Sequence, residues 1–402
     1  MRRFRLPLII LAAALSLRCI SASEFQVHEW GTFTTLHTTN GVSIEWYQPY
    51  LKRAEDALPK FVAPGIGTKF GNMRIRMETP VIYFYTKEPR KVTVNAAMAE
   101  GNITEVFPRA NRLNHEGTFS SPLLLQQPRF SQSWDVDLIP PGSRDAADII
   151  LPTDTEDADN HYYIARQVPE AAFVKAAEAK MKETQYEKFI FYRGAGNESL
   201  GSPARIGKDG TVSLNQNTPY NTVWLLDSKP HSLAWQKLTK PESGEASTNH
   251  EVLPNYENRE KSIQELFTSL HSSLVEAGLS DNESKAMINT WRNHWFTEPG
   301  VRILSLPPRN VIDQLVPLRI TPSPSSLERV FVHRAEILLP EVIENLEKAM
   351  SARIEPEEAR DVIESQNLGR FTRPAIIETA RQIGNRTAAE HQQRGLSALK
   401  TE

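Results

Sequence analysis

The chain has 402 residues, of which 40% are hydrophobic and 24% are charged, and its formal net charge is -3. These fractions are ordinary for a globular protein, so they argue against a disordered chain and against a coiled coil. The acidic balance excludes a basic surface for nucleic acid, and the length predicts two domains of roughly 100–200 residues each.

Residues 1–23 have the three parts of a cleaved secretory signal: the cationic start MRRFR, an apolar run over 6–17, and the small-residue exit SAS. The apolar run is too short to span a bilayer of about 30 Å, so no transmembrane segment is expected in the mature chain. Cleavage would lower the net charge to -7 and remove the only cysteine, Cys19. Arg18, immediately before it, argues against a lipoprotein. A cysteine-free exported chain fits a periplasmic or extracellular protein.

The first predicted strand, residues 25–36, reads FQVHEWGTFTTL. Alternate residues of a strand share a face, so His28 and Glu29 point in opposite directions. Gly31 is placed where a bulge or a close backbone approach is expected. His28 and Glu29 are candidate catalytic residues, and His28 is also a candidate metal ligand. The structural alternative, a half-buried His28 beside a core Trp30, is the commoner use of a histidine.

Residues 24–240 consist mostly of short β-branched and aromatic segments separated by Pro, Gly and Asn. This pattern predicts an antiparallel β-sandwich-like domain. The segment 161–168 is read as one of its strands, and the Ala- and Lys-rich segment 170–183 as a surface helix.

Residues 74–85, RIRMETPVIYFY, hold the second cluster of candidate site residues. Glu78 is a candidate catalytic acid or base, and Arg76 a candidate anion clamp. Tyr83 and Tyr85 share a strand face and are candidates for an aromatic platform on which a sugar or peptide stacks. The alternatives are an exposed salt-bridge set, which adds only about 0–1 kcal/mol, and ordinary sheet packing.

A third cluster joins residues near 161 to the strand KFIFYR at 188–193. His161 is a candidate metal ligand together with His28. Arg193, at the end of its strand, either closes a buried ion pair with a carboxylate such as Glu78 or binds an anion. The candidate ligand-binding residues are Trp30, Arg76, Tyr83, Tyr85, Tyr162, Arg166, Tyr192 and Arg193.

The polar segment 241–256 predicts a linker, and 257–402 an α-rich α+β domain. A 3.6-residue apolar period follows the linker and ends at Gly278, and Ser280 with Glu283 forms a capping-box pattern that opens a second helix. This second helix carries Trp291, His294 and Trp295, whose spacing is typical of a core face. The whole chain is therefore predicted to be α+β.

The motifs VHEWGTFT, METPVIYFY, FYRG and RVFVHRAEILLPE together resemble those of a family of exported bacterial proteins without an assigned activity. The resemblance spans most of the mature chain. It implies a common two-part architecture and export, and it carries no activity, cofactor or catalytic residue.

The aromatic and arginine content of the β domain favours a ligand-binding or cell-envelope interaction module, with a carbohydrate or a peptide as its ligand. The aromatic residues concerned are Trp30, Trp46, Tyr47, Tyr50, Tyr83, Tyr85, Tyr162 and Tyr192. The alternative is a hydrolase, with or without a metal, that uses His28, Glu29, Glu78 and His161. A third possibility is a scaffold whose charged motifs only hold the fold. The cofactor and the oligomeric state stay open.

Overall fold

The computed structural model describes most of the chain after the predicted signal. The residues described are 24–47, 58–64, 73–114, 131–157, 159–176, 183–198, 200–207, 211–214, 219–240, 250–251, 257–351, 353–383 and 388–399. None of the helices within these ranges is long and apolar enough to cross a membrane. The predicted signal at 1–23 lies outside them.

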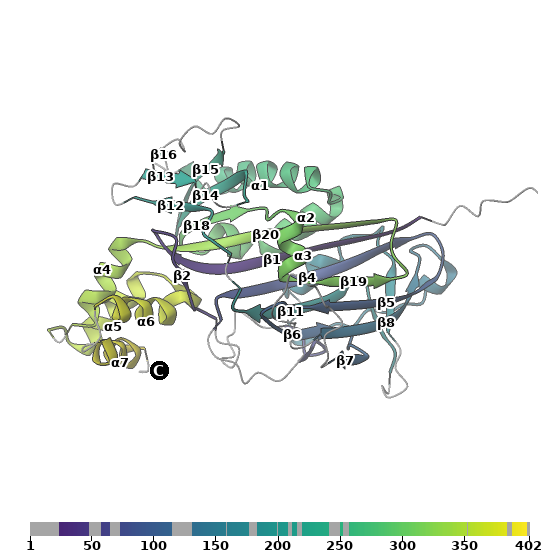
Figure 1. Cartoon of the computed structure of the whole chain (residues 1–402), viewed down its shortest axis with the longest axis horizontal. Coiled ribbons are helices and arrows are strands. Elements are labelled where there is room, and N and C mark those ends of the chain that lie inside the picture. The colour runs from purple at the N-terminus through teal and green to yellow at the C-terminus, as the bar shows by residue number, and fades with distance from the viewer. Residues whose placement is uncertain are drawn as a thin grey trace, which may run out of the picture.

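An 11-stranded sheet forms the centre of the molecule (Figure 1). Its strands, in spatial order, are β17 (Glu257–Asn258), β15 (Ser232–Thr239), β14 (Thr222–Lys229), β18 (Gly300–Ser305), β20 (Ser326–Leu338), β1 (Phe25–Thr38), β4 (Ile75–Thr86), β11 (Ile190–Gly196), β6 (Gly101–Phe107) and β3 (Ala63–Pro64), with β2 (Ser43–Ile44) paired to β1. The pairs β1–β4 and β4–β11 are antiparallel, whereas β1 and β20 run parallel.

Two smaller sheets accompany the central one. The 6-stranded sheet contains β10 (Gln185–Glu187), β9 (Phe173–Ala176), β8 (Ser131–Ile139), β5 (Arg90–Ala97), β19 (Leu318–Thr321) and β7 (Arg112–Asn114). The 3-stranded sheet contains β12 (Ala204–Ile206), β13 (Thr211–Leu214) and β16 (His250–Glu251).

The α-helices among the described residues come from the second half of the chain. They are α1 (Arg259–Glu276), α2 (Asp281–Arg292), α3 (Arg309–Leu315), α4 (Pro340–Ala349), α5 (Pro356–Ser365), α6 (Thr372–Ile383) and α7 (Ala388–Ala398). The mixed α+β class, with a sheet-rich N-terminal region and C-terminal helices, is confirmed. The predicted capping box opens α2, and Gly278, with a φ of +115°, follows the end of α1.

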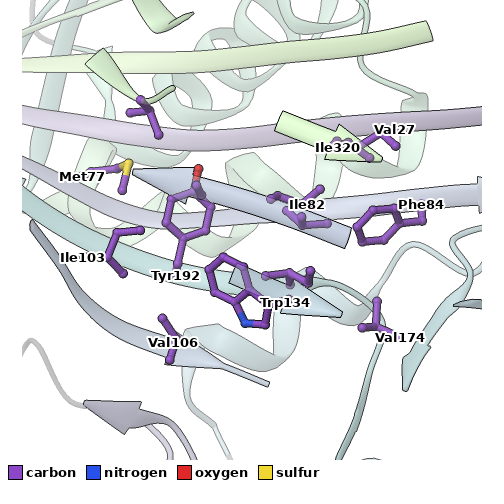
Figure 2. Packing of buried hydrophobic residues seen from close by; sticks show 14 of the residues in the cluster. Val27, Met77, Ile82, Phe84, Ile103, Val106, Trp134, Val174, Tyr192 and Ile320 are labelled. Atoms are coloured by element: carbon purple, nitrogen blue, oxygen red, sulfur yellow. The ribbon is translucent and has the colours of Figure 1, made fainter. Parts of the chain in front are cut away.

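The two faces of the central sheet are covered differently. One face packs on the 6-stranded sheet through a core that includes Met77, Trp134 and Tyr192, all three labelled in Figure 2. The other face carries α1 and α2 over one apolar cluster, and α4 to α7 over a second one. In Figure 1 the C-terminal helices, coloured yellow, gather at one end of the sheet.

Two local predictions need correction. Residues 161–166 form a 3-10 helix rather than a strand, and 173–176 form β9 rather than part of a helix, whereas 177–182 of the predicted helix lie outside the described residues. The predicted linker lies mostly outside the described residues, but β20, which follows it, pairs along its whole length with β1, which precedes it. Strands from both sides of the predicted boundary therefore belong to one sheet.

Gly31 lies opposite a bulge in β4, because the register between β1 and β4 shifts between Trp30 and Thr32, where Thr79 and Pro80 of β4 face this one residue of β1. The expected close backbone approach is therefore found, but the bulge is in the partner strand. A Cβ at this position would lie 2.7 Å from Cε1 of Phe331 and 3.1 Å from the Cα of Pro80. We expect Gly31→Ala to lower the free energy of unfolding by about 1–3 kcal/mol, the usual cost of overpacking. Urea unfolding measures this loss. A Gly31→Ala, Phe331→Leu double variant should recover part of it, and an unchanged midpoint in the single variant would contradict the packing described.

Candidate functional site

A band of charged residues crosses the helix-covered face of the central sheet. Along β20, Val332 belongs to the apolar cluster under α1 and α2, and Leu338 to the cluster under α4 to α7. Between them, on the same strand face, lie Arg334 and Glu336. The neighbouring strands repeat this change from apolar to polar. The band, called the charged seam below, consists of Thr34, Arg76, Glu78, Arg193, Arg302, Arg334 and Glu336, all of them buried.

Glu78 is the carboxylate of the seam on β4. It accepts hydrogen bonds from Thr34 Oγ1 at 2.9 Å and from Arg370 Nη1 at 2.5 Å, and Arg76 Nη1 lies 3.2 Å from it. Arg370 comes from the 3-10 turn Gly369–Phe371, just before α6. The carboxylate therefore joins the C-terminal helices to the sheet through a buried ion pair.

A second group of ion pairs continues the seam toward β18. Arg334 donates to Glu336 at 2.6 Å and to Glu298 at 2.5 Å. The Nε of Arg302 lies 2.8 Å from Glu336, and its other nitrogens donate to the backbone carbonyls of His294, Trp295, Glu298 and Pro299 at 2.7–3.0 Å. Arg302 thus donates to backbone carbonyls across residues 294–299 as well as to a carboxylate.

The strands and helices around the seam depart from regular geometry at several neighbouring positions. The bulge in β4 opposite Gly31 also shifts the pairing of β4 with β11, between Phe191 and Gly194. Thr79, between the two halves of β4, has a φ of +46°, which is rare for a β-branched residue. The segment Asn293–Thr297 after α2 is a π-helix. Strained residues and π-helices both concentrate at functional sites.

Two histidines meet beside these irregularities. The ring of His161 lies 6.2 Å from that of His294, and the ring of Trp291 lies 5.7 Å from the first and 5.6 Å from the second. His161 begins the 3-10 helix, whereas His294 belongs to the π-helix. His161 is partly buried, and the His294 side chain is 19% exposed. The pair is therefore held by the fold and remains accessible.

The charged partner of each imidazole determines its neutral tautomer. Arg193 Nη2 lies 3.1 Å from His161 Nε2, and because a guanidinium only donates, the proton of a neutral His161 is on Nδ1. His294 Nδ1 is hydrogen-bonded to the Glu298 carboxylate, which leaves Nε2 of a neutral His294 unprotonated. The histidine site, which we define as His161, Arg193, His294 and Glu298, thus offers one N–H donor and one nitrogen lone pair when both imidazoles are neutral.

The electrostatic field at this site is positive. Burial would raise the pKa of Glu78, but Arg370 and Arg76 outweigh it and hold this pKa well below its usual range. Burial would likewise raise the pKa of Glu298, but the charge of Arg334 and a hydrogen bond from His294 outweigh it and hold this pKa low. Burial, followed by Arg193 and His294, lowers the pKa of His161 to about 3. His161 is therefore neutral at pH 7, and the guanidinium groups dominate the local field.

The first strand places its two candidate catalytic residues in different surroundings, as their alternation predicts. His28 Nδ1 lies 2.8 Å from Glu283 Oε2 at the start of α2. Glu29 points to the other face, where it accepts hydrogen bonds from Arg329 and from the hydroxyl of Tyr192. Glu78 is on the same face as His28. The structure thus does not bring His28, Glu29 and Glu78 into one catalytic group.

His28 and His161 do not form the predicted metal pair. His28 contacts Glu283 in the first turn of α2, whereas His161 contacts Trp291 in the last turn. Eight residues of helix separate these two contacts by about 12 Å. Within the described ranges, no three His, Cys, Asp or Glu side chains are grouped so that they would hold a metal ion.

Most of the predicted aromatic platform is core. Trp30, Tyr83, Tyr162 and Tyr192 are fully buried, and Tyr85 is only partly buried, with its hydroxyl donating to Glu283. Trp46 and Tyr47 are buried as well, and Tyr50 lies outside the described residues. The prediction that these residues form an exposed stacking surface is therefore wrong.

The predicted arginines have different roles. The Nη2 of Arg166 lies 2.7 Å from Oε2 of the buried Glu187, so this arginine stabilises the fold. Arg76 is buried against Glu78, so the exposed salt-bridge set predicted for this strand is wrong. One alternative for Arg193 is a direct ion pair with Glu78. The Nη2 of Arg193 lies against His161 rather than against Glu78.

Sequence reasoning missed His294, Glu298, Arg334 and Arg370. A signal exists for Arg334, since RVFVHRAEIL places a charge on a strand face that is apolar both before and after it. His294 and Glu298 are four residues apart, but a tryptophan-rich helix face is usually core. No local pattern connects Arg370 with a glutamate 292 positions earlier.

Comparisons with known proteins add no function. No family model matches the chain, and no curated protein matches it. One solved structure that matches is the Fcho1 Mu homology domain of Danio rerio with bound Eps15 peptide, at 7% sequence identity, covering 79% of this chain and 97% of that chain, with a TM-score of 0.26. A TM-score this low does not establish a common fold.

Proposed function

We propose that this protein is an exported binding protein that takes a small oxyanion, a carboxylate or a phosphate group, at the histidine site. The observation that carries the proposal is the pair of accessible imidazoles 6.2 Å apart with Arg193 donating to one of them. The N–H of His161 and the guanidinium of Arg193 are the donors that oxyanions prefer.

The electrostatic environment supports an anionic ligand rather than a cationic or neutral one. Arg370 and the arginines of the charged seam hold the carboxyl groups of Glu78 and Glu298 ionised, and burial together with Arg193 keeps His161 neutral. The same field stabilises a negative charge brought in from solvent, and its effect is large where protein excludes water. Because the predicted aromatic platform is buried, a stacked sugar is not the ligand that we propose.

Calorimetric titration of the mature chain with succinate and with inorganic phosphate tests this function. We expect binding by at least one of them, and at least a 10-fold weaker affinity in Arg193→Lys, since lysine lacks the planar fork of donors. Arg292→Lys is the matched control, because Arg292 lies at the end of α2 and pairs with the exposed Glu260. Absence of binding by either anion at millimolar concentration, or equal affinities in the two variants, would refute the proposal.

A further inference from the structure

We infer that the histidine site also hydrolyses its ligand, and that the substrate class is a carboxylic ester carrying a second, anionic group. This inference rests on the proposed anion binding. It is carried by the complementary tautomers of the two histidines: one accessible imidazole presents a lone pair and the other presents an N–H, with ring centroids 6.2 Å apart.

His294 has the surroundings of a general base. Its Nδ1–H donates to Glu298, a carboxylate that Arg334 holds in turn at 2.5 Å. A carboxylate on one ring nitrogen fixes the imidazole's orientation and stabilises the cation formed when the other nitrogen takes a proton. Arg302 binds the carbonyls of His294 and Trp295 within the π-helix and those of Glu298 and Pro299 just after it, which holds the segment that carries His294. Such positioning is what general-base catalysis requires.

His161 has the surroundings of an oxyanion stabiliser. Its low pKa keeps it neutral, so it donates a hydrogen bond from Nδ1 without giving up its proton. Arg193, at 3.1 Å from the other nitrogen, fixes the tautomer. Neither imidazole is hydrogen-bonded to a serine, threonine or cysteine among the residues that the structure describes, and we therefore assign water as the nucleophile.

The reaction balances with water as the only co-reactant. His294 Nε2 takes a proton from water as the water oxygen bonds to the ester carbonyl carbon, and the carbonyl electron pair moves to the oxygen facing His161. Collapse of this tetrahedral intermediate breaks the bond to the alcohol oxygen, which takes the proton from His294. The products are an alcohol and a carboxylic acid, and the acid releases one proton to solvent at neutral pH.

Proton release in a pH-stat measures this activity, with monomethyl and monophenyl succinate as substrates and dimethyl succinate as the neutral comparison. We expect turnover of a monoester that exceeds turnover of the diester. His294→Gln should lower kcat by about 10²–10⁴-fold, the usual contribution of a general base. His28→Gln is the matched control, since His28 is also paired with a buried glutamate and should retain full activity.

The outcomes distinguish this inference from the binding function. Succinate binding without turnover of either monoester above the buffer rate would overturn hydrolysis and leave anion binding standing. Turnover that His294→Gln retains in a folded protein would also overturn it. Absence of both binding and turnover would overturn both proposals.

Discussion

Replacing Glu78 with glutamine is expected to lower the free energy of unfolding by about 3–5 kcal/mol, because removing one partner of a buried ion pair leaves charge without its counter-charge in a region of low polarity. Glu78 is 1% exposed and contacts both Arg76 and Arg370. Glutamine keeps the size and one acceptor oxygen but loses the negative charge. Urea unfolding, followed by far-UV circular dichroism, measures the difference.

The control for this variant is Glu260→Gln. Glu260 pairs with Arg292, but its side chain is 74% exposed, and surface pairs contribute about 0–1 kcal/mol. If Glu78→Gln cost no more than Glu260→Gln, the charged seam would not be the buried network described above.

Acidification is expected to destabilise the protein below pH 6.5 through another pair of histidines, His37 and His333, both of which are fully buried. Thr35 Oγ1 lies 2.7 Å from Nε2 of both His37 and His333, and the hydroxyl of Tyr220 lies 2.9 Å from Nδ1 of His333. Burial lowers the pKa of His37 to about 4, and burial and His37 lower the pKa of His333 well below 6.5. The folded protein therefore keeps both imidazoles neutral where the unfolded chain protonates them.

The unfolded chain binds more protons than the folded protein. The free energy of unfolding therefore decreases as the pH is lowered, by about 1.4 kcal/mol per pH unit for each histidine, from pH 6.5 down to that histidine's pKa in the folded protein. We expect His333→Gln to reduce this slope by about 1.4 kcal/mol per unit between pH 5.5 and 4.5, although the variant is less stable at pH 7. Urea unfolding at several pH values measures both slopes. Other titrating groups are common to the two proteins, so equal slopes would show that His333 is already protonated in the folded state.

Much of the fold follows from local sequence. The alternation in 25–36 predicts the opposite directions of His28 and Glu29, and the capping box at Ser280 predicts the start of α2. Prolines at the starts of α4 and α5 stand where a first helical turn accepts them. These features depend on neighbouring residues only, which is why one sequence suffices to predict them.

The histidine site depends on contacts between distant parts of the chain. His161 and His294 meet only because α2 packs on the 3-10 helix that starts at His161, and the parallel pairing of β1 with β20 joins residues about 300 positions apart. A hydrophobic pattern predicts which face of a strand is buried, but not which strand lies beside it. Buried arginines and glutamates are also rare, so charge in a strand is first read as exposed.

Crystallography of the mature protein soaked in selenate, whose selenium gives an anomalous signal, tests directly whether the histidine site binds an oxyanion. We expect an anomalous peak with selenate oxygens within hydrogen-bond distance of His161 Nδ1 and the Arg193 guanidinium. Selenate bound only elsewhere on the protein, with no anomalous peak between His161 and His294, would contradict it.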